Sequence, residues 1–130
     1  MEEVVRTGSC ACGRVKWQAK GEPRRVGLCH CMDCRKAHGA TFNPFVVYAR
    51  EQVTVEGTPT PWRSSAEYVR WFCGTCGSRV FGEQPGEYEL SLGGFDEVGV
   101  LAPQYENWCV RREPWLPDLG IPQHERDRPR

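Results

Sequence analysis

Seven of the eight cysteines stand in three close-set groups, and this feature constrains the fold more than any other. The groups are Cys10/Cys12, Cys29/Cys31/Cys34 and Cys73/Cys76. Spacings of C-x-C and C-x-x-C favour metal binding over disulfides in a reducing compartment, and two thiols separated by one residue are poorly placed to bridge each other. We therefore expect thiolate–metal bonds, and zinc is the metal that such ligands suit.

The composition narrows the class of protein. At 130 residues the chain is long enough for one core but not for two independent ones. A formal net charge of zero gives no electrostatic reason to expect binding to nucleic acid or to an anionic membrane. There is no membrane-spanning apolar run and no signal-peptide pattern, so we expect a cytoplasmic protein. We expect one domain over residues 1–122 and a frayed polar tail over 123–130.

Alternating apolar and polar residues indicate short strands over much of the chain. The candidates are residues 15–20, 42–48, 53–55, 67–72, 79–81 and 88–92, with a weaker one at 105–110. Pro44 indicates an edge or a bulge, 53–55 is expected as the hairpin partner of 42–48, and residues 58–65 are expected as a loop. Residues 35–38, ending at Gly39, favour one or two helical turns. The pattern predicts a mainly β domain with one short helix.

The two cysteine pairs are sufficient for one closed, structural zinc site. Its four thiolates would come from Cys10, Cys12, Cys73 and Cys76. Glycines beside Cys10 and Cys12 let the backbone turn tightly with both sulfurs on one side. Glycines in the turn from Cys73 to Gly77 leave backbone N–H groups free to donate to sulfur. Each pair precedes a strand, so one metal would join two strand ends about sixty residues apart, where a crosslink removes much chain entropy.

The remaining group, Cys29/Cys31/Cys34, has one ligand too few to close a tetrahedron. His38 lies one helical turn after Cys34 and could supply the fourth ligand. His30 lies between two ligands, so its side chain should point away from them. Cys109 is another candidate for the fourth ligand, although a lone cysteine is also explained as a small buried apolar residue. The other alternative is an open fourth position that a substrate can occupy.

An open zinc ion with three thiolates favours thiol chemistry. Its net negative charge makes it a poor Lewis acid, so activation of water for hydrolysis is not expected. Capture of a substrate thiol is expected, because a thiolate is both a good zinc ligand and a nucleophile. Nearby cations would offset the added negative charge, and the candidates are Arg35, Lys36 and a protonated His38. The rings of Phe42 and Phe45 are candidates for a pocket lining.

Three stretches together resemble the glutathione-dependent formaldehyde-activating enzyme family, also called the GFA or CENP-V type domain. They are Gly8-x-Cys10-x-Cys12-Gly13-x-Val15, Cys29-His30-Cys31-x-x-Cys34-Arg35-Lys36-x-x-Gly39 and Phe72-Cys73-x-x-Cys76-Gly77-Ser78. Residues 95–96 and 114–117 are similar to the C-terminal part of that family, so the resemblance covers residues 4–122.

The resemblance implies a β-tent (Mss4-like) fold of stacked, mostly antiparallel sheets with two zinc ions. By motif, the cysteine pairs match the structural ligands and Cys29, Cys31 and Cys34 match the catalytic ligands. The implied activity is that of a carbon–sulfur lyase acting on the adduct of glutathione with formaldehyde or a related small aldehyde. In this enzyme Arg35 would anchor a substrate carboxylate or offset the charge of the site, and His38 or His30 would transfer a proton.

A non-catalytic function is the alternative. A zinc module of this fold could bind a protein partner, with both zinc ions structural and His38 completing the second site. Its candidate surface would be the exposed aromatic residues at Trp62 and between Trp108 and Trp115. A nucleic-acid binder is not expected, because no basic stripe is present.

Overall fold

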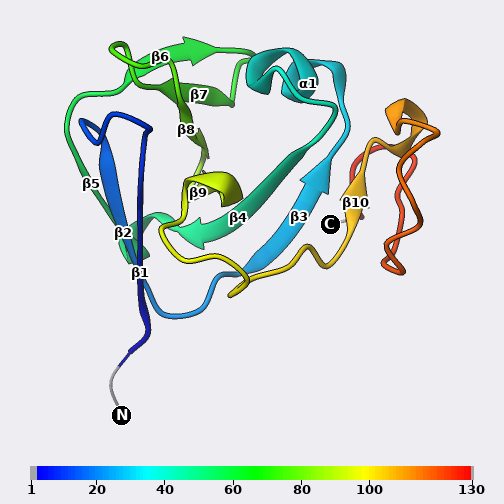
Figure 1. Ribbon diagram of the computed structural model, residues 1–130, viewed down its shortest axis with the longest axis horizontal. Coiled ribbons are helices and arrows are strands. Elements are labelled where there is room, and N and C mark those ends of the chain that lie inside the picture. Colours follow the sequence, from blue (N-terminus) through cyan, green and yellow to red (C-terminus); the bar gives the residue numbers. More distant parts are fainter. Residues whose placement is uncertain (1–2, 130) are drawn as a thin grey trace.

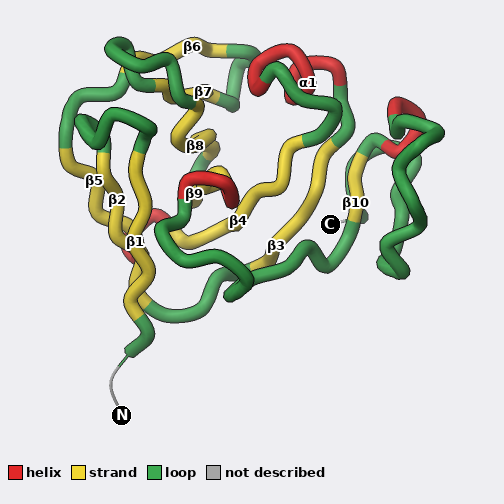
Figure 2. Tube along the Cα trace, in the orientation of Figure 1, coloured by secondary structure: helices red, strands yellow, loops and turns green. Residues whose placement is uncertain are grey.

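The computed structural model describes residues 3–129 and contains two β-sheets, drawn in Figures 1 and 2. The smaller sheet has the order β1-β2-β5 and consists of β1 (Val5–Ser9), β2 (Lys16–Lys20) and β5 (Val53–Glu56). The larger sheet has the order β10-β3-β4-β9-β8-β7-β6. Its strands are β3 (Arg25–Cys29), β4 (Asn43–Ala49), β6 (Thr60–Arg63), β7 (Val69–Phe72), β8 (Arg79–Gln84), β9 (Glu87–Ser91) and β10 (Glu106–Asn107). Neighbouring strands are antiparallel except β10 and β3, so the prediction of a mainly β fold with mostly antiparallel sheets is confirmed.

The main core lies between the two sheets. In β2 the apolar side chains of Trp17 and Ala19 point inward and are buried, while the lysines and glutamine between them face solvent. Trp17 packs edge-to-face on Phe95, with ring centroids 4.4 Å apart, and burial of one such side chain contributes about 1.5–3 kcal/mol. A side chain at Gly8 would collide with Trp17, since a Cβ there would lie 2.1 Å from the indole ring.

The short helix α1 (Met32–His38) follows β3 at the end of the larger sheet (Figure 1). Its N-cap is Cys31, whose sulfur accepts a hydrogen bond from the N–H of Cys34, and it ends at Gly39 in the left-handed conformation (φ 60°). The predicted end of the helix is confirmed, and its start lies three residues earlier than expected. Three 3₁₀ turns complete the described structure: Arg50–Gln52, Leu92–Gly94 and Cys109–Arg111. No helix in the described part of the chain is long and apolar enough to cross a membrane.

Three predictions about strands were wrong: one pairing, one edge position and one loop. β5 pairs with β2 in the smaller sheet, not with β4. β4 is an interior strand between β3 and β9, and Pro44 is tolerated there because the ladder to β9 begins only at Phe45. Residues 60–63, expected within a loop, form β6, which pairs with β7 through exposed side chains that gave no burial pattern.

The C-terminal residues pack against β10, although we expected them to fray. The N–H of His124 donates to the carbonyl of Glu106 at 2.8 Å, and the N–H of Trp108 donates to the carbonyl of Arg126 at 2.9 Å. Figure 1 shows this segment, coloured red, running beside β10. The tail therefore continues the larger sheet beyond β10 instead of leaving it.

Candidate metal centres and the adjoining cleft

The two cysteine pairs come together as the sequence predicts. All four sulfurs of Cys10, Cys12, Cys73 and Cys76 lie within 4.8 Å of one another. The Cys10–Cys12 and Cys12–Cys73 sulfur distances are 3.6 and 3.7 Å, close to the separation of about 3.8 Å expected for four sulfurs placed tetrahedrally around zinc at 2.3 Å. The N–H groups of Val15 and Cys76 donate to the Cys10 and Cys73 sulfurs. This group fits a closed, structural zinc site.

The second group is built where β3 meets α1. Cys29 ends the strand, Cys31 caps the helix and Cys34 lies in its first turn. The three sulfurs lie within 4.8 Å of one another, and no other histidine, cysteine or carboxylate of residues 3–129 joins them. The donor set suits zinc and leaves one tetrahedral position without a protein ligand.

The charge state of these thiols is set by their mutual contacts. Contacts with the Cys29 and Cys34 thiols, aided by the N–H of Cys34 and the charge of Arg70, lower the pKa of Cys31 below its ordinary value. The same contacts raise the pKa of Cys29, because its thiol is the hydrogen-bond donor to its neighbours. One thiolate is therefore already favoured before a metal binds.

A cleft of about 600 Å³ opens above this group. The cysteines form one end of it, and its walls come from α1, β4, β7, β9 and the segment after β10. Its aromatic lining includes Phe45, as expected, together with Tyr68 and Trp108. Phe42 instead packs against the His30 ring outside this cleft, with ring centroids 5.9 Å apart. The cleft gives a small molecule access to the three sulfurs.

The cation closest to the sulfurs is Arg70, which the sequence did not identify as a site residue. Its guanidinium nitrogens lie 3.7 and 3.8 Å from the Cys34 sulfur, and its Nε donates to Ser64 at 3.1 Å. The side chain is buried and stacks on the Tyr68 ring at 4.9 Å. Although burial alone would lower the pKa of Arg70, the neighbouring thiols raise it, so the guanidinium offsets thiolate charge.

An acid pair lies farther along the same cleft. The hydroxyl of Tyr68 donates to Oε1 of Glu89 at 2.7 Å, and both residues line the cleft. Burial raises the pKa of Glu89 above its ordinary value, and burial next to this carboxylate also raises the pKa of Tyr68. Because its pKa is raised, Glu89 is a candidate for the proton transfer that the sequence assigned to histidine.

The predicted helper residues lie outside the cleft. Arg35 pairs with Glu113 at 2.8 Å, and neither Arg35 nor Lys36 is part of the cleft wall. His38 faces another cavity, beside Arg79, and its Nε2 finds no hydrogen-bond partner within residues 3–129. Burial, followed by the charge of Arg79, lowers the pKa of His38 to about 4. His38 thus lies neither among the three sulfurs nor in the wall of this cleft.

His30 points away from the sulfurs, as expected, and is fully buried. Its Nε2 lies 2.8 Å from Glu106, forming a group with Cys109 that has the spacing of metal ligands. Glu106 also accepts from the Nε of Arg112 at 2.9 Å. Burial would raise the pKa of Glu106, but the Arg112 contact lowers it. Because Arg112 already compensates this carboxylate, the group is explained as an ion pair that joins β10 to the cysteine segment.

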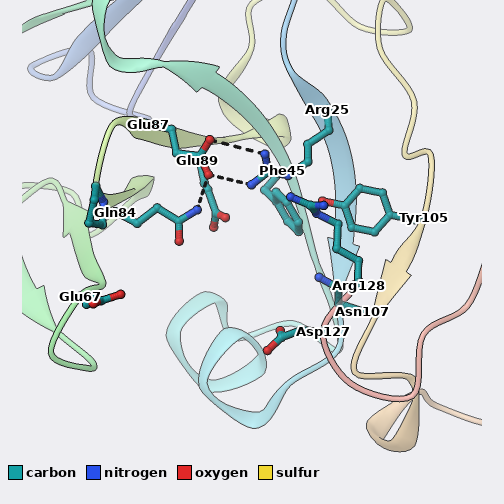
Figure 3. A pocket seen from close by; sticks show the side chains of 11 residues that line it. Arg25, Phe45, Glu67, Gln84, Glu87, Glu89, Tyr105, Asn107, Asp127 and Arg128 are labelled. Atoms are coloured by element: carbon teal, nitrogen blue, oxygen red, sulfur yellow. Dashed lines mark hydrogen bonds and ion pairs between the residues drawn. The ribbon is translucent and has the colours of Figure 1, made fainter. Parts of the chain in front are cut away.

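A second hollow of about 580 Å³ adjoins the cleft, and the two share Phe45, Gln84, Glu89, Asn107 and Asp127 as lining residues. Figure 3 shows this outer part. Arg25 pairs with Glu87 at 2.7 Å, and Arg128, on the same side of the hollow in Figure 3, reaches past Tyr105 toward Phe45. The site is therefore an elongated cleft with sulfur at one end and charged side chains at the other.

Comparisons with known proteins agree with this architecture. A crystal structure of a Rhodobacter sphaeroides protein has a similar fold, with a TM-score of 0.60 and 21% sequence identity over 91% of this chain and 98% of that chain. The family model for glutathione-dependent formaldehyde-activating enzyme matches residues 5–111, which include all seven clustered cysteines. The match covers most of the chain, and the protein therefore belongs to the glutathione-dependent formaldehyde-activating enzyme (GFA) family.

Proposed function

We propose that this protein is a zinc-dependent carbon–sulfur lyase that joins a small thiol to a small aldehyde and cleaves the adduct. Glutathione and formaldehyde, or close relatives of them, are the proposed substrates. The observation that supports this most is a group of three thiols at the end of a cleft, with no fourth ligand from residues 3–129. A closed structural site needs no such cleft, whereas a reactive one does.

The residues around the sulfurs have three different roles: metal binding, charge compensation and exclusion of water. A zinc ion held by Cys29, Cys31 and Cys34 would stabilise the substrate sulfur as a thiolate, the form that attacks carbonyl carbon. Arg70 holds positive charge against Cys34 and offsets the negative charge that a further thiolate brings. Phe45 and Trp108 exclude water from the walls of the cleft.

Proton transfer completes the reaction. In the forward direction the substrate sulfur, having released its proton, forms a bond to the aldehyde carbon. The carbonyl π electrons move to oxygen, which takes a proton from the Glu89 carboxyl group. Glu89 recovers a proton from solvent, equal to the one that the thiol released, so no net proton is consumed. Tyr68 holds the Glu89 carboxyl through its 2.7 Å hydrogen bond, and the reverse reaction breaks the carbon–sulfur bond.

The proposal is tested with a variant that removes the second zinc site while the protein stays folded. The variant Cys31→Ser should retain one zinc ion per chain and form the thiol–aldehyde adduct at less than about a hundredth of the wild-type rate. The matched control is Cys109→Ser, the same change at a cysteine outside both sulfur groups, and it should keep two zinc ions and the full rate. Zinc content by atomic absorption and adduct formation by NMR measure both effects. An unchanged adduct rate in Cys31→Ser with one zinc ion lost would exclude the catalytic role.

The same measurements address the alternative function. A wild-type protein with two firmly bound zinc ions that forms no adduct with any thiol would be a zinc module. Exposed aromatic residues, such as Trp62 (51% exposed) and Trp115 (63% exposed), would then be its candidate contact surface. A cytoplasmic location, where glutathione is abundant and thiols stay reduced, is part of the enzyme proposal.

A further inference from the structure

The C-terminal segment contributes to the wall of the cleft. Asp127 lines both its inner and outer parts, and Arg128 lines the outer part. The match to the family model ends at residue 111, so this wall lies beyond the matched residues. The residues of this wall are therefore not specified by the family model, and selectivity can be set there.

Trp108 is the point to which the segment is anchored. Its N–H donates to the Arg126 carbonyl at 2.9 Å, and its indole Nε1 donates to Oδ1 of Asp127 at 3.0 Å. The Arg126 guanidinium stacks on the indole at 5.6 Å. Trp108 itself has a left-handed backbone (φ 58°), which a side chain of this size rarely adopts without support. These contacts fix Asp127 against the cleft wall.

Some charged side chains of the outer cleft form ion pairs with each other, and others do not. Arg25 is paired with Glu87, and both oxygens of Glu87 accept hydrogen bonds. Arg128, in contrast, has no carboxylate within ion-pair distance in the described chain; its guanidinium lies over the Tyr105 ring at 5.9 Å and donates to the Pro129 carbonyl. Glu67 has no ion pair within residues 3–129 either, and Asp127 contacts only the uncharged indole. Apart from Glu89, which accepts from the Tyr68 hydroxyl, the outer cleft thus offers one available cation, Arg128, and two available carboxylates, Glu67 and Asp127.

This arrangement matches a ligand that carries both charges. A carboxylate would meet Arg128, and an ammonium group would meet Asp127, which lies lower in the same hollow in Figure 3, while Glu67 adds negative charge on the far wall. The sulfur end of the cleft would meanwhile accept the thiol. A thiol that bears an α-amino-acid group at its far end has both features in the required order.

Resting on the proposed function, we propose that Arg128 and Asp127 determine specificity by binding the α-amino-acid end of the thiol substrate. The sulfur group then selects for a thiol, and the C-terminal segment selects which thiol. Neither residue takes part in the bond changes. Their loss should weaken binding of a zwitterionic thiol and leave the reaction of an uncharged thiol unaffected.

The first test separates specificity from chemistry. In Arg128→Gln the KM for glutathione should rise about tenfold, the expected effect of losing one charge-assisted hydrogen bond, with kcat changed less than about twofold. The kinetics with 2-mercaptoethanol, which has no charged group, should not change. Asp127→Asn should raise the KM for glutathione by a smaller factor, because asparagine keeps the acceptor for Trp108 and removes only the charge. Glu125→Gln, a matched change outside the cleft wall, should have no effect.

The second test does not depend on catalysis. S-methylglutathione keeps the amino-acid end but has no free thiol, and calorimetry should show that Arg128→Gln weakens its binding to the zinc-loaded protein about tenfold. Equal losses with glutathione and 2-mercaptoethanol, or unchanged binding of S-methylglutathione, would overturn the proposal. A larger effect of Arg111→Gln, an exposed cation at the sulfur end of the cleft, would also overturn it by placing the carboxylate there. If the wild-type protein forms no adduct but still binds S-methylglutathione in an Arg128-dependent way, the proposed reaction is refuted and the binding role of the C-terminal segment is not.

Discussion

The two sulfur groups share local geometry but differ in their surroundings. In each C-x-x-C turn the N–H of the later cysteine donates to the earlier sulfur, at 3.3 Å for Cys34 to Cys31 and 3.5 Å for Cys76 to Cys73. The same backbone turn thus prepares both groups for a metal. What differs is the number of sulfurs, four against three, and what lies beside them.

Those surroundings separate a crosslink from a reaction centre. The four-sulfur group joins the loops before β2 and β8, and two of its cysteines, Cys12 and Cys76, are exposed. The three-sulfur group instead has buried Arg70 against it and the cleft above it. A group with a full set of ligands can only hold the chain together, whereas a group with an open position and a charge partner can act on a ligand.

The largest effect should come from breaking the closed group. Cys73→Ser removes one of four ligands that join segments sixty-one residues apart, and because zinc binding is coupled to folding we expect a loss of about 5 kcal/mol or more in unfolding free energy. Thermal unfolding followed by circular dichroism measures it. Cys31→Ser is the matched control and should lower the melting temperature only slightly. Similar losses in the two variants would contradict the division of roles.

The acid beside the open group should control the rate. Glu89→Gln keeps the acceptor for the Tyr68 hydroxyl but cannot transfer a proton, so kcat for adduct formation should fall about 100-fold while zinc content stays constant. The groups that face this carboxyl are Tyr68 from the loop before β7, Arg70 from β7, Arg25 from β3 and Glu87 from β9. An unchanged kcat would show that another group carries the proton.

Although Glu89→Gln should lower the rate, it should raise the thermal stability relative to wild type as the pH increases. Because the folded-state pKa of Glu89 is raised, its contribution to stability is fully present below the ordinary pKa of a glutamate and is lost as pH rises through the raised value. Glutamine has no such loss. The melting temperature of Glu89→Gln relative to wild type should therefore increase as pH rises from about 5 to 8. A difference that is constant with pH would contradict the raised pKa.

The metal-binding cysteine groups could be predicted from the sequence, but the residues that line the cleft could not. Cysteine spacing predicts which sulfurs meet, because turn geometry within each group is local. Arg70 and Glu89 reach the site only through the pairing of β7, β8 and β9, which no local pattern encodes. A signal was nevertheless present: alternation in residues 67–72 places Arg70 on the same face as Tyr68 and Phe72, and a charge among aromatic residues on one strand face requires a partner.

The errors in the fold have similar causes. β6 has exposed side chains throughout, so it lacks the alternation that identifies a half-buried strand. The residues after 122 are mostly polar, so they were expected to fray. Their contacts with Trp108 and β10 are made mainly by backbone groups, and amino-acid composition does not predict backbone hydrogen bonds. The predictions for Arg35 and His38 rested on their position after Cys34 in the sequence, which does not say where a side chain points; α1 places them beside Glu113 and Arg79.

The charge partner of the open group gives the next effect in size. Arg70→Gln leaves Cys34 without its guanidinium, and we expect the affinity of the second zinc ion, measured by competition with a chromophoric chelator, to fall about tenfold. Arg35→Gln, the same change on α1, removes only a partly exposed ion pair with Glu113 and should change the affinity less than about twofold. If the two variants behave alike, general charge and not the Arg70 contact sets the metal affinity.

The smallest effect is expected at His38, the residue whose ligation would make the two groups alike. Its Nε2 lacks a partner in the described chain and its pKa is lowered to about 4, so it is neutral at pH 7 and does not titrate near neutrality. His38→Gln should therefore keep two zinc ions per chain, and its rate of adduct formation between pH 6 and 8 should stay within about twofold of wild type. Zinc content and pH–rate profiles measure both quantities. A lost zinc ion would mean that His38 closes the second group in the metal-bound protein, and the contrast between a closed and an open site would then fail.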